Sequence, residues 1–294
     1  MDLIVKYLRK MQKNSNEPRI RANLNNYHVD IVKSIPYMDD GKEEHRMDIY
    51  RPKHMEGKLP VIIEVHGGAY VSCYKEVNQQ HGTYLASKGF CVVNMNYTLY
   101  PEADLTHMVK EVCAVLNWVH TNASKYGFDT EHVCLTGDSA GGHVVLMAAA
   151  ALNDVEIAQS YEIPEMKQKV YKYALSCPMG SLEDLRNPKG GLFQILKIIF
   201  KKVLKDAAYM KKIDYHWYMT KHFPEVFILT TPMDALLYEH TRAMHTYMEA
   251  NGINHVYKEY SQKENNLEHV FNVLYPDYAE SMAANDDMVT YLMQ

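Results

Sequence analysis

The sequence lacks any long hydrophobic run. Its longest uninterrupted apolar segment, Val144 to Leu152, has nine residues, whereas a helix that spans a bilayer needs about 20. The opening residues, MDLIVKYLRKMQK, interleave charged and apolar side chains at helical spacing and have neither the apolar block nor the small-residue cleavage site of a secretory signal. We therefore expect no membrane span and a cytoplasmic location.

Cysteine is scarce, and no segment collects charges of one sign. The five cysteines lie far apart and form no C-x-x-C pair, which argues against a zinc site or a redox dithiol and favours buried thiols in a reducing compartment. The 31 basic and 36 acidic residues give a net charge of −5 and are spread along the chain. Nucleic-acid binders depend on clustered Lys and Arg, so we expect neither a metal nor a nucleic-acid partner.

Short segments rich in β-branched and aromatic residues alternate with helical patterns from about residue 47 onward. The predicted strands are 47–52, 59–68, 89–97, 132–139, 170–178, 225–232 and 255–261. The predicted helices are 77–88, 104–126, 140–152, 239–251 and 277–292. This rhythm indicates an α/β fold, with a mainly parallel sheet covered by helices on both faces and reactive groups at the carboxyl ends of the strands.

Two stretches fall outside the alternation and predict the domain organisation. Residues 1–45 precede it and are expected to form an N-terminal cap segment, and residues 46–294 the catalytic domain. Residues 179–222 interrupt that domain as a cap insertion, which contains the basic amphipathic block LFQILKIIFKKVLK. We interpret this block as a lid helix with one face on the core; the alternative is a helix that binds anionic lipid.

The segment Gly137-Asp138-Ser139-Ala140-Gly141 matches the pattern G-x-S-x-G between a predicted strand and a predicted helix. A sharp turn there would expose the Ser139 hydroxyl in a strained conformation, and the flanking glycines would let strand and helix pack closely. The helix amino end also favours negative charge. The pattern in this context predicts that Ser139 is a nucleophile; a turn with an incidental serine is the alternative.

A serine hydroxyl becomes an effective nucleophile when an imidazole removes its proton. Of the 15 histidines, His269 lies where such a base is needed, in the loop after the last predicted strand of the sheet. Asp234 follows the preceding strand, where its carboxylate can orient the imidazole and offset its charge. The alternative role of Asp234 is a helix N-terminal cap, and one side chain can do both. Asp138 adjoins the nucleophile and is expected to point elsewhere.

The segment His66-Gly67-Gly68-Ala69 ends another predicted strand. Acyl transfer needs hydrogen-bond donors aimed at the oxyanion of the transition state. Glycine lets the backbone approach a substrate closely, so the NH groups of this loop can join that of Ala140 as donors. A turn needed only for folding is the alternative, and we interpret His66 as a structural support of the loop.

Together these motifs resemble the hormone-sensitive-lipase-like carboxylesterases of the α/β-hydrolase superfamily. The resemblance covers about residues 45–294 and rests on GDSAG at 137–141, HGGA at 66–69, NYTLYPE at 96–102 and the chain order of serine, aspartate and histidine. It implies an α/β-hydrolase fold with an eight-stranded, mostly parallel sheet and a helical cap. It further implies the triad Ser139, Asp234 and His269, with oxyanion donors at Gly68, Ala69 and Ala140 and Gly67 beside them.

The resemblance also implies a reaction, the hydrolysis of small-molecule esters with short or medium acyl chains, without a metal or organic cofactor. It permits a homodimer. Three positions depart from the family's usual pattern: Ala69 replaces a glycine, Thr98 an arginine, and Val270 the glycine after the histidine. Two other functions remain open, an arylformamidase or small-peptide amidase on the same fold and a ligand-binding relative without catalysis.

Overall fold

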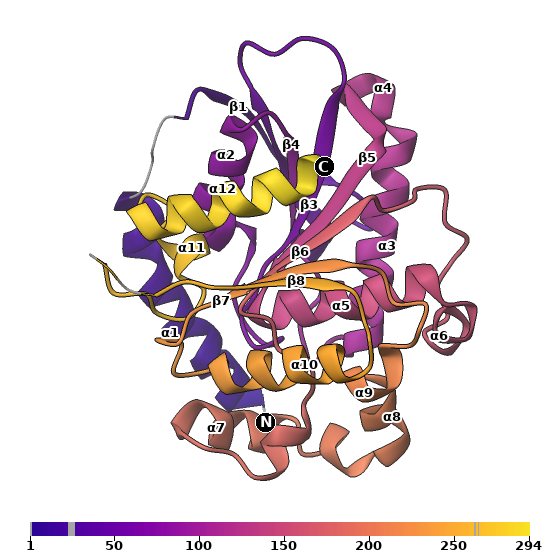
Figure 1. Cartoon of the computed structure of the whole chain (residues 1–294), viewed down its shortest axis with the longest axis vertical. Helices are drawn as coiled ribbons and strands as arrows, with labels where there is room; N and C mark the ends of the chain where they lie inside the picture. The colour runs from indigo at the N-terminus through magenta and orange to yellow at the C-terminus, as the bar shows by residue number, and fades with distance from the viewer. Residues whose placement is uncertain (1, 23–26, 262, 264) are drawn as a thin grey trace.

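The centre of the molecule is an eight-stranded sheet (Figure 1). The computed structural model describes residues 2–22, 27–261, 263 and 265–294. The strands lie in the order β1-β2-β4-β3-β5-β6-β7-β8. Their bounds are Val29–Pro36 (β1), Arg46–Pro52 (β2), Leu59–Val65 (β3), Cys91–Met95 (β4), Phe128–Asp138 (β5), Lys172–Ser176 (β6), Val226–Thr230 (β7) and His255–Glu259 (β8).

The sheet is mostly parallel. Among the described strands, β2 alone runs against the others, because it pairs antiparallel with both β1 and β4 while β4, β3, β5, β6, β7 and β8 pair in parallel. Every residue of β4 and β7 is buried, as expected for parallel strands covered on both faces. The predicted α/β fold and its seven predicted strands are confirmed.

The eighth strand, β1, was not predicted as a strand. It lies in the segment 1–45, which we expected to precede the sheet, so that expectation is wrong for residues 29–36; residues 1 and 23–26 of the segment lie outside the described residues. The sequence VDIVKSIP gave no strand signal because β1 is an edge strand whose side chains are mostly exposed. Such a strand needs no regular apolar face.

Helices cover both faces of the sheet, and the alternation of side chains along β3 separates two cores. Ile62 packs in a cluster with residues of α2 and α12, whereas Val61 and Ile63 pack in a cluster with residues of α3 and α5. The long helices are α1 (Asp2–Ala22), α2 (Gln79–Ser87), α3 (Leu105–Thr121), α5 (Ser139–Asn153), α7 (Gly191–Ile199), α10 (Tyr238–Ala250) and α12 (Ala279–Met293). The short ones are α4 (Ala123–Tyr126), α6 (Val155–Ser160), α8 (Ala207–Lys212), α9 (Tyr215–Tyr218) and α11 (Phe271–Leu274).

Segments far apart in sequence gather at one end of the molecule. Figure 1 shows α7, α8, α9 and α10 at the lower end of the molecule, with α1 running down one side toward the same end. In α7, Phe193, Leu196 and Ile199 are buried while Lys197 is exposed, which agrees with a lid helix that packs one face on the core. None of the described helices is long and apolar enough to cross a membrane.

Candidate active site

Ser139 lies at the junction of β5 and α5. Its φ angle is +52°, a left-handed conformation that is strained for a residue with a side chain. The glycines on either side permit this turn: a Cβ on Gly137 would lie 2.7 Å from the backbone of Gly141, and a Cβ on Gly141 would lie 2.2 Å from the carbonyl oxygen of Val65. The glycines therefore hold strand and helix close enough to present the Ser139 hydroxyl.

The fold brings Ser139, His269 and Asp234 together from three loops. His269 Nε2 lies 2.9 Å from Ser139 Oγ, and His269 Nδ1 lies 2.7 Å from Asp234 Oδ2. A carboxylate only accepts hydrogen bonds, so Nδ1 carries the proton in this pair and Nε2 is free to accept the serine proton. The three side chains thus form a continuous hydrogen-bonded chain from carboxylate to hydroxyl.

The carboxylate of Asp234 is buried, and it accepts several hydrogen bonds. Its Oδ1 accepts hydrogen bonds from the backbone N–H groups of Leu236 and Leu237, each at 2.9 Å. Burial raises the pKa of Asp234, but the hydrogen bond and charge of His269, with those two amides, outweigh burial and lower that pKa below its ordinary value. Asp234 therefore stays ionised beside the imidazole. The two amides that it binds precede α10, which begins at Tyr238 and has no side-chain cap, so Asp234 stabilises the turn before that helix and does not cap it.

The loop after β3 faces the serine. Gly68 has a φ of +117°, and a Cβ there would lie 2.1 Å from the Ser72 carbonyl oxygen, so only glycine fits this close turn. The amide of Gly67 donates to Asp138 Oδ1 at 3.0 Å. In the described part of the chain, no hydrogen bond occupies the amides of Gly68 and Ala69, while Ala140 lies in the first turn of α5, where N–H groups have no helical partner.

Asp138 connects the serine turn to this loop, a contact that the sequence analysis missed. Its Oδ1 also accepts from Asn78 Nδ2 at 2.7 Å. The only sequence signal was its place beside the nucleophile, where we expected the side chain to point away. The Asp138 carboxylate instead holds the Gly67 amide in place. A buried carboxylate next to a strained turn needs hydrogen-bond donors, and the loop after β3 supplies this one.

Glu64, an acidic residue inside the apolar strand β3, also has partners. His81 Nδ1 lies 2.5 Å from its Oε1, and Asn78 Nδ2 donates to the same oxygen at 3.4 Å. Burial raises the pKa of Glu64, against the opposing effect of His81. Asn78 therefore links a buried polar cluster beneath the site to Asp138.

His66 lies where a structural support is expected. Its Nδ1 is 2.7 Å from the Gly67 carbonyl oxygen, its ring stacks on Tyr97 at 4.4 Å, and Tyr97 donates to the His66 carbonyl at 2.7 Å. Burial lowers the pKa of His66 to about 4. The imidazole is neutral and held by Gly67 and Tyr97, and in the described part of the chain no hydrogen bond joins it to Ser139 that would make it a second base.

One group of three potential metal ligands lies close together among the described residues: Cys177, Asp234 and His269, with ligand atoms within 4.8 Å of one another. Asp234 and His269 already hydrogen-bond each other. Burial raises the pKa of the Cys177 thiol well above its ordinary value, which disfavours the thiolate that binds zinc. This set therefore does not fit a zinc centre.

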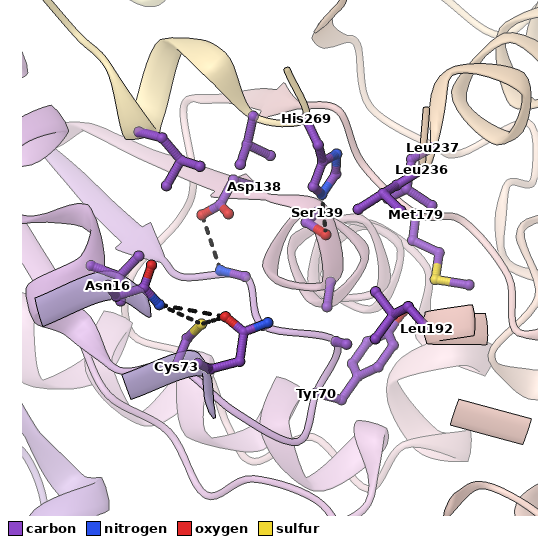
Figure 2. Close-up of a pocket in the computed structure, with 18 of the residues that line it drawn as sticks. Asn16, Tyr70, Cys73, Asp138, Ser139, Met179, Leu192, Leu236, Leu237 and His269 are labelled. Atoms are coloured by element: carbon purple, nitrogen blue, oxygen red, sulfur yellow. Dashed lines mark hydrogen bonds between the residues drawn. The ribbon is translucent and has the colours of Figure 1, made fainter. Parts of the chain in front are cut away.

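Ser139 and His269 open into a cavity of about 480 Å³. Its walls come from the loop after β3, from α1 and α7, and from the segment that leads into α10 (Figure 2). The cavity therefore lies between the carboxyl ends of the strands and both predicted cap segments. The sequence did not indicate which cap residues face it.

Comparison with known proteins places the chain in a family. The sequence profile of the BD-FAE family matches residues 47–248. A probable isoprenylcysteine alpha-carbonyl methylesterase of Arabidopsis thaliana is 32% identical over a segment covering 45% of this chain and 27% of that protein. The probable carboxylic ester hydrolase LipM of Mycobacterium tuberculosis is 33% identical over 44% of this chain and 30% of its own length. The chain thus spans less than a third of these relatives.

Solved structures share the fold along nearly the whole chain. Esterase B of Lactobacillus rhamnosis has a TM-score of 0.91 and 23% identity, and the match covers 99% of this chain and 94% of that one. A Pyrobaculum calidifontis esterase has a TM-score of 0.71 and 20% identity, with 98% of this chain and 92% of that one covered. With the profile match over most of the chain, these likenesses identify the protein as an α/β-hydrolase that belongs to the BD-FAE family.

Proposed function

We propose that this protein is a serine carboxylesterase. The observation that carries the proposal is the unbroken contact from Asp234 through His269 to Ser139, at 2.7 and 2.9 Å, at the wall of a substrate-sized cavity. Ester hydrolysis needs a base in reach of a nucleophile and donors for the oxyanion. The names of the relatives support the same proposal, since they include a methylesterase, a carboxylic ester hydrolase and an esterase.

In the proposed reaction, Ser139 Oγ attacks the ester carbonyl carbon while its proton passes to His269 Nε2. The carbonyl oxygen becomes an oxyanion, which accepts hydrogen bonds from the amides of Gly68, Ala69 and Ala140. Collapse of this intermediate breaks the bond to the alcohol oxygen, and His269 returns the proton to that oxygen. Water, deprotonated by the same imidazole, then attacks the carbonyl carbon of the acyl-serine ester. Collapse of this second intermediate breaks the bond to Ser139 Oγ, which takes the proton back from His269 Nε2, and the acid is released.

Gly67 has a supporting part in this proposal. Its amide is already bound to Asp138, so it holds the loop in place rather than contacting the oxyanion. The hydrogen bond to Asp138 thus distinguishes Gly67 from the proposed oxyanion donors, beside which the sequence analysis expected it to lie.

The acyl group that we propose is short to medium in length. The cavity of about 480 Å³ has mostly hydrophobic side chains on one wall, including Leu192, Leu196 and Leu236. A space of this size is at the lower end of the range for small-molecule sites, and it must hold both halves of the ester.

The test is hydrolysis of p-nitrophenyl esters from acetate to dodecanoate by the unmodified protein and by Ser139→Ala. We expect an optimum at short or medium chains and a fall in kcat of about 10⁴-fold or more in Ser139→Ala, because the nucleophile is lost. Ser87→Ala, an exposed serine at the end of α2, is the matched control and should retain full activity.

Turnover in Ser139→Ala equal to that of Ser87→Ala would contradict the proposal. Matched anilides in the same assay test the amidase alternative, which uses the same groups. Faster cleavage of the anilide than of the ester would favour an amidase over an esterase.

A further inference from the structure

Two residues beside Asp234 and His269 share the left-handed backbone of Ser139. The φ angle is +45° at Cys177 and +52° at Val270. This region is unfavourable for a residue with a Cβ and most of all for a β-branched one. Such strain persists only where the surrounding structure enforces it, and it is concentrated at functional sites. The contacts of Cys177 and Val270 therefore need an explanation.

The two residues come from different loops and pack together. Cys177 directly follows β6, and Val270 directly follows His269. Both are buried, in a small hydrophobic cluster with Val273. The Cys177 amide donates to the Leu229 carbonyl oxygen at 2.8 Å, which fixes the backbone of Cys177 beside β7. The sulfur is therefore held between the end of the sheet and the loop that carries the proposed base.

The Cys177 sulfur also lies beside the acid and the base of the candidate triad. Its Sγ, an Asp234 carboxylate oxygen and a His269 ring nitrogen all lie within 4.8 Å of one another. The Thr230 hydroxyl donates to the same sulfur at 3.8 Å. The thiol thus occupies the side of the Asp234–His269 pair that faces the interior of the protein.

In this place the thiol is protonated and acts as a donor. Burial and then the charge of Asp234 raise the pKa of Cys177 well above its ordinary value, against the opposing effects of the Val270 amide and the Thr230 hydroxyl. A hydrogen bond between the thiol and Asp234 raises that pKa further. A carboxylate only accepts hydrogen bonds, so the S–H group donates in this contact.

The thiol completes the set of donors around Asp234. An ionised carboxylate has about four acceptor sites. Oδ1 accepts from the amides of Leu236 and Leu237, and Oδ2 lies 2.7 Å from His269 Nδ1. The S–H group of Cys177 supplies a fourth donor. Rotation of the carboxylate away from the imidazole would therefore break several hydrogen bonds at once.

The same sulfur receives the amide that follows the imidazole. The N–H group of Val270 is hydrogen-bonded to the Cys177 thiol, and in the part of the chain that the structure describes no backbone carbonyl accepts that N–H. Sulfur is a weak donor and a weak acceptor, so one thiol can make both contacts. Cys177 thereby connects the proposed acid to the loop of the proposed base.

Resting on the proposed esterase function, we infer that Cys177 is a positioning residue of the triad, whose thiol donates to the Asp234 carboxylate and accepts from the Val270 amide. It holds the acid and the base loop at the separation that the contact between Asp234 and His269 requires. This role accounts for the strained backbone at Cys177 and Val270, which turns the sulfur and the amide toward each other.

Loss of the thiol would change both contacts. Without the S–H donor, the carboxylate keeps more negative charge, which favours the protonated imidazole, so a higher pH is needed to free the base. Without the sulfur, the Val270 amide loses its acceptor. The loop of His269 is then held less well, which slows proton transfer from Ser139.

The test compares Cys177→Ala with Cys177→Ser on one p-nitrophenyl ester, across the pH range in which histidine titrates. The two variants differ by one hydroxyl group, which can donate to Asp234 and accept from Val270. We expect Cys177→Ala to lower kcat by about 2- to 10-fold, the value of one hydrogen bond. The acid limb of its kcat/KM profile should move to higher pH by about 0.3 to 1 unit, the same factor on a logarithmic scale. Cys177→Ser should recover most of the rate and the original profile.

A role in packing alone predicts a different order. The cluster around Cys177 is hydrophobic, so a hydroxyl group would fit there no better than the methyl group of alanine. Equal losses in the two variants, or a larger loss in Cys177→Ser, would overturn the inference. Cys113→Ala and Cys113→Ser are the matched controls, because Cys113 is buried in α3 and burial is the cause that raises its pKa to about 12. Neither should shift the profile.

A second readout needs no turnover. The His269 Nδ1 proton, hydrogen-bonded to Asp234, is expected at low field in the proton NMR spectrum. It should move further downfield in Cys177→Ala, because the carboxylate is then a stronger acceptor, and return in Cys177→Ser; an unchanged resonance in both would refute the inference. If Ser139→Ala cleaves esters as fast as the unmodified protein, the esterase proposal fails, and this resonance still decides whether Cys177 positions the pair. Thermal unfolding verifies that each variant is folded.

Discussion

At the scale of single residues, Asp138 connects two parts of the candidate active site, although it is not one of the three groups proposed to react. One of its oxygens accepts hydrogen bonds from the amide of Gly67 and the side chain of Asn78. It thereby joins the turn that presents the nucleophile to the loop that presents the proposed oxyanion donors. An error of about 1 Å in such a loop is enough to weaken transition-state hydrogen bonds.

We therefore predict that Asp138→Ala lowers kcat by about 10- to 100-fold with little change in KM, less than the loss expected when a donor itself is removed. Asp138→Asn keeps an oxygen that can accept the same two hydrogen bonds and should recover most of the rate. Steady-state kinetics on one p-nitrophenyl ester measures both. An equal loss in the two variants would mean that the negative charge, rather than the hydrogen bonds, is what matters.

The sequence analysis identified the residues proposed to react better than the residues that hold them in place. Ser139 has a local pattern around it, and chain order selected Asp234 and His269, which the fold does bring into contact. Asp138, Asn78 and Cys177 have no such pattern. Their roles depend on which loops meet in space, which a single sequence does not contain.

At the scale of secondary-structure elements, the close approach of α5 to the end of β3 requires a glycine at position 141. A Cβ on Gly141 would lie 2.2 Å from the Val65 carbonyl oxygen and 2.4 Å from that of His66. Both atoms belong to backbone that cannot rotate away. The strand and the helix must therefore separate if any side chain is added at this position.

We predict that Gly141→Ala destabilises the protein by about 3 kcal/mol, at the upper end of the usual range for an overpacked site. Urea unfolding at pH 7 measures the change. Gly191→Ala is the matched control: no atom lies within 4 Å of a Cβ there, so a change below about 0.5 kcal/mol is expected. Similar stability of the two variants would show that the close approach is relaxed in solution.

Strands were predicted from the sequence where burial requires a run of apolar side chains, and one strand was missed where its side chains are exposed. The wholly buried strands β4 and β7 gave runs rich in β-branched and other apolar residues, whereas the exposed edge strand β1 gave no clear apolar pattern. The sequence predicted a lid helix in the block LFQILKIIFKKVLK, which spans residues 192–205, but α7 ends at Ile199 and its buried face includes Phe193 and Leu196. The register of a short amphipathic helix depends on the surface that it meets.

At the scale of the whole molecule, buried histidines link stability to pH. His143 is buried; its Nε2 donates to the Ile213 carbonyl at 2.9 Å, and its Nδ1 accepts from the Tyr70 hydroxyl at 2.7 Å. Burial lowers the pKa of His143 to about 4 from an ordinary value of 6.5. Its neutral form thus stabilises the fold above pH 6.5, and this contribution is lost as the pH falls toward 4, because the unfolded chain binds a proton first.

The predicted loss from His143 between pH 6.5 and 4 is about 3 kcal/mol, since each unit of pKa difference corresponds to about 1.4 kcal/mol. His143→Gln retains a donor and an acceptor but does not titrate, so its stability should fall less over this range. Urea unfolding at pH 7 and pH 4 measures the difference. His54→Gln, at an exposed position, should behave like the unmodified protein, and an identical pH dependence in His143→Gln would refute the prediction.

The division of the cavity between two kinds of element has an evolutionary consequence. The side chains proposed to react follow strands of the sheet, whose positions are fixed by packing on both faces, whereas much of the cavity wall belongs to α1 and α7, which lie at the edge of the fold. Substitutions on these two helices leave the sheet and its loops intact. Gene duplicates of this protein could therefore diverge in substrate range by a few changes in either helix while inheriting the same chemistry.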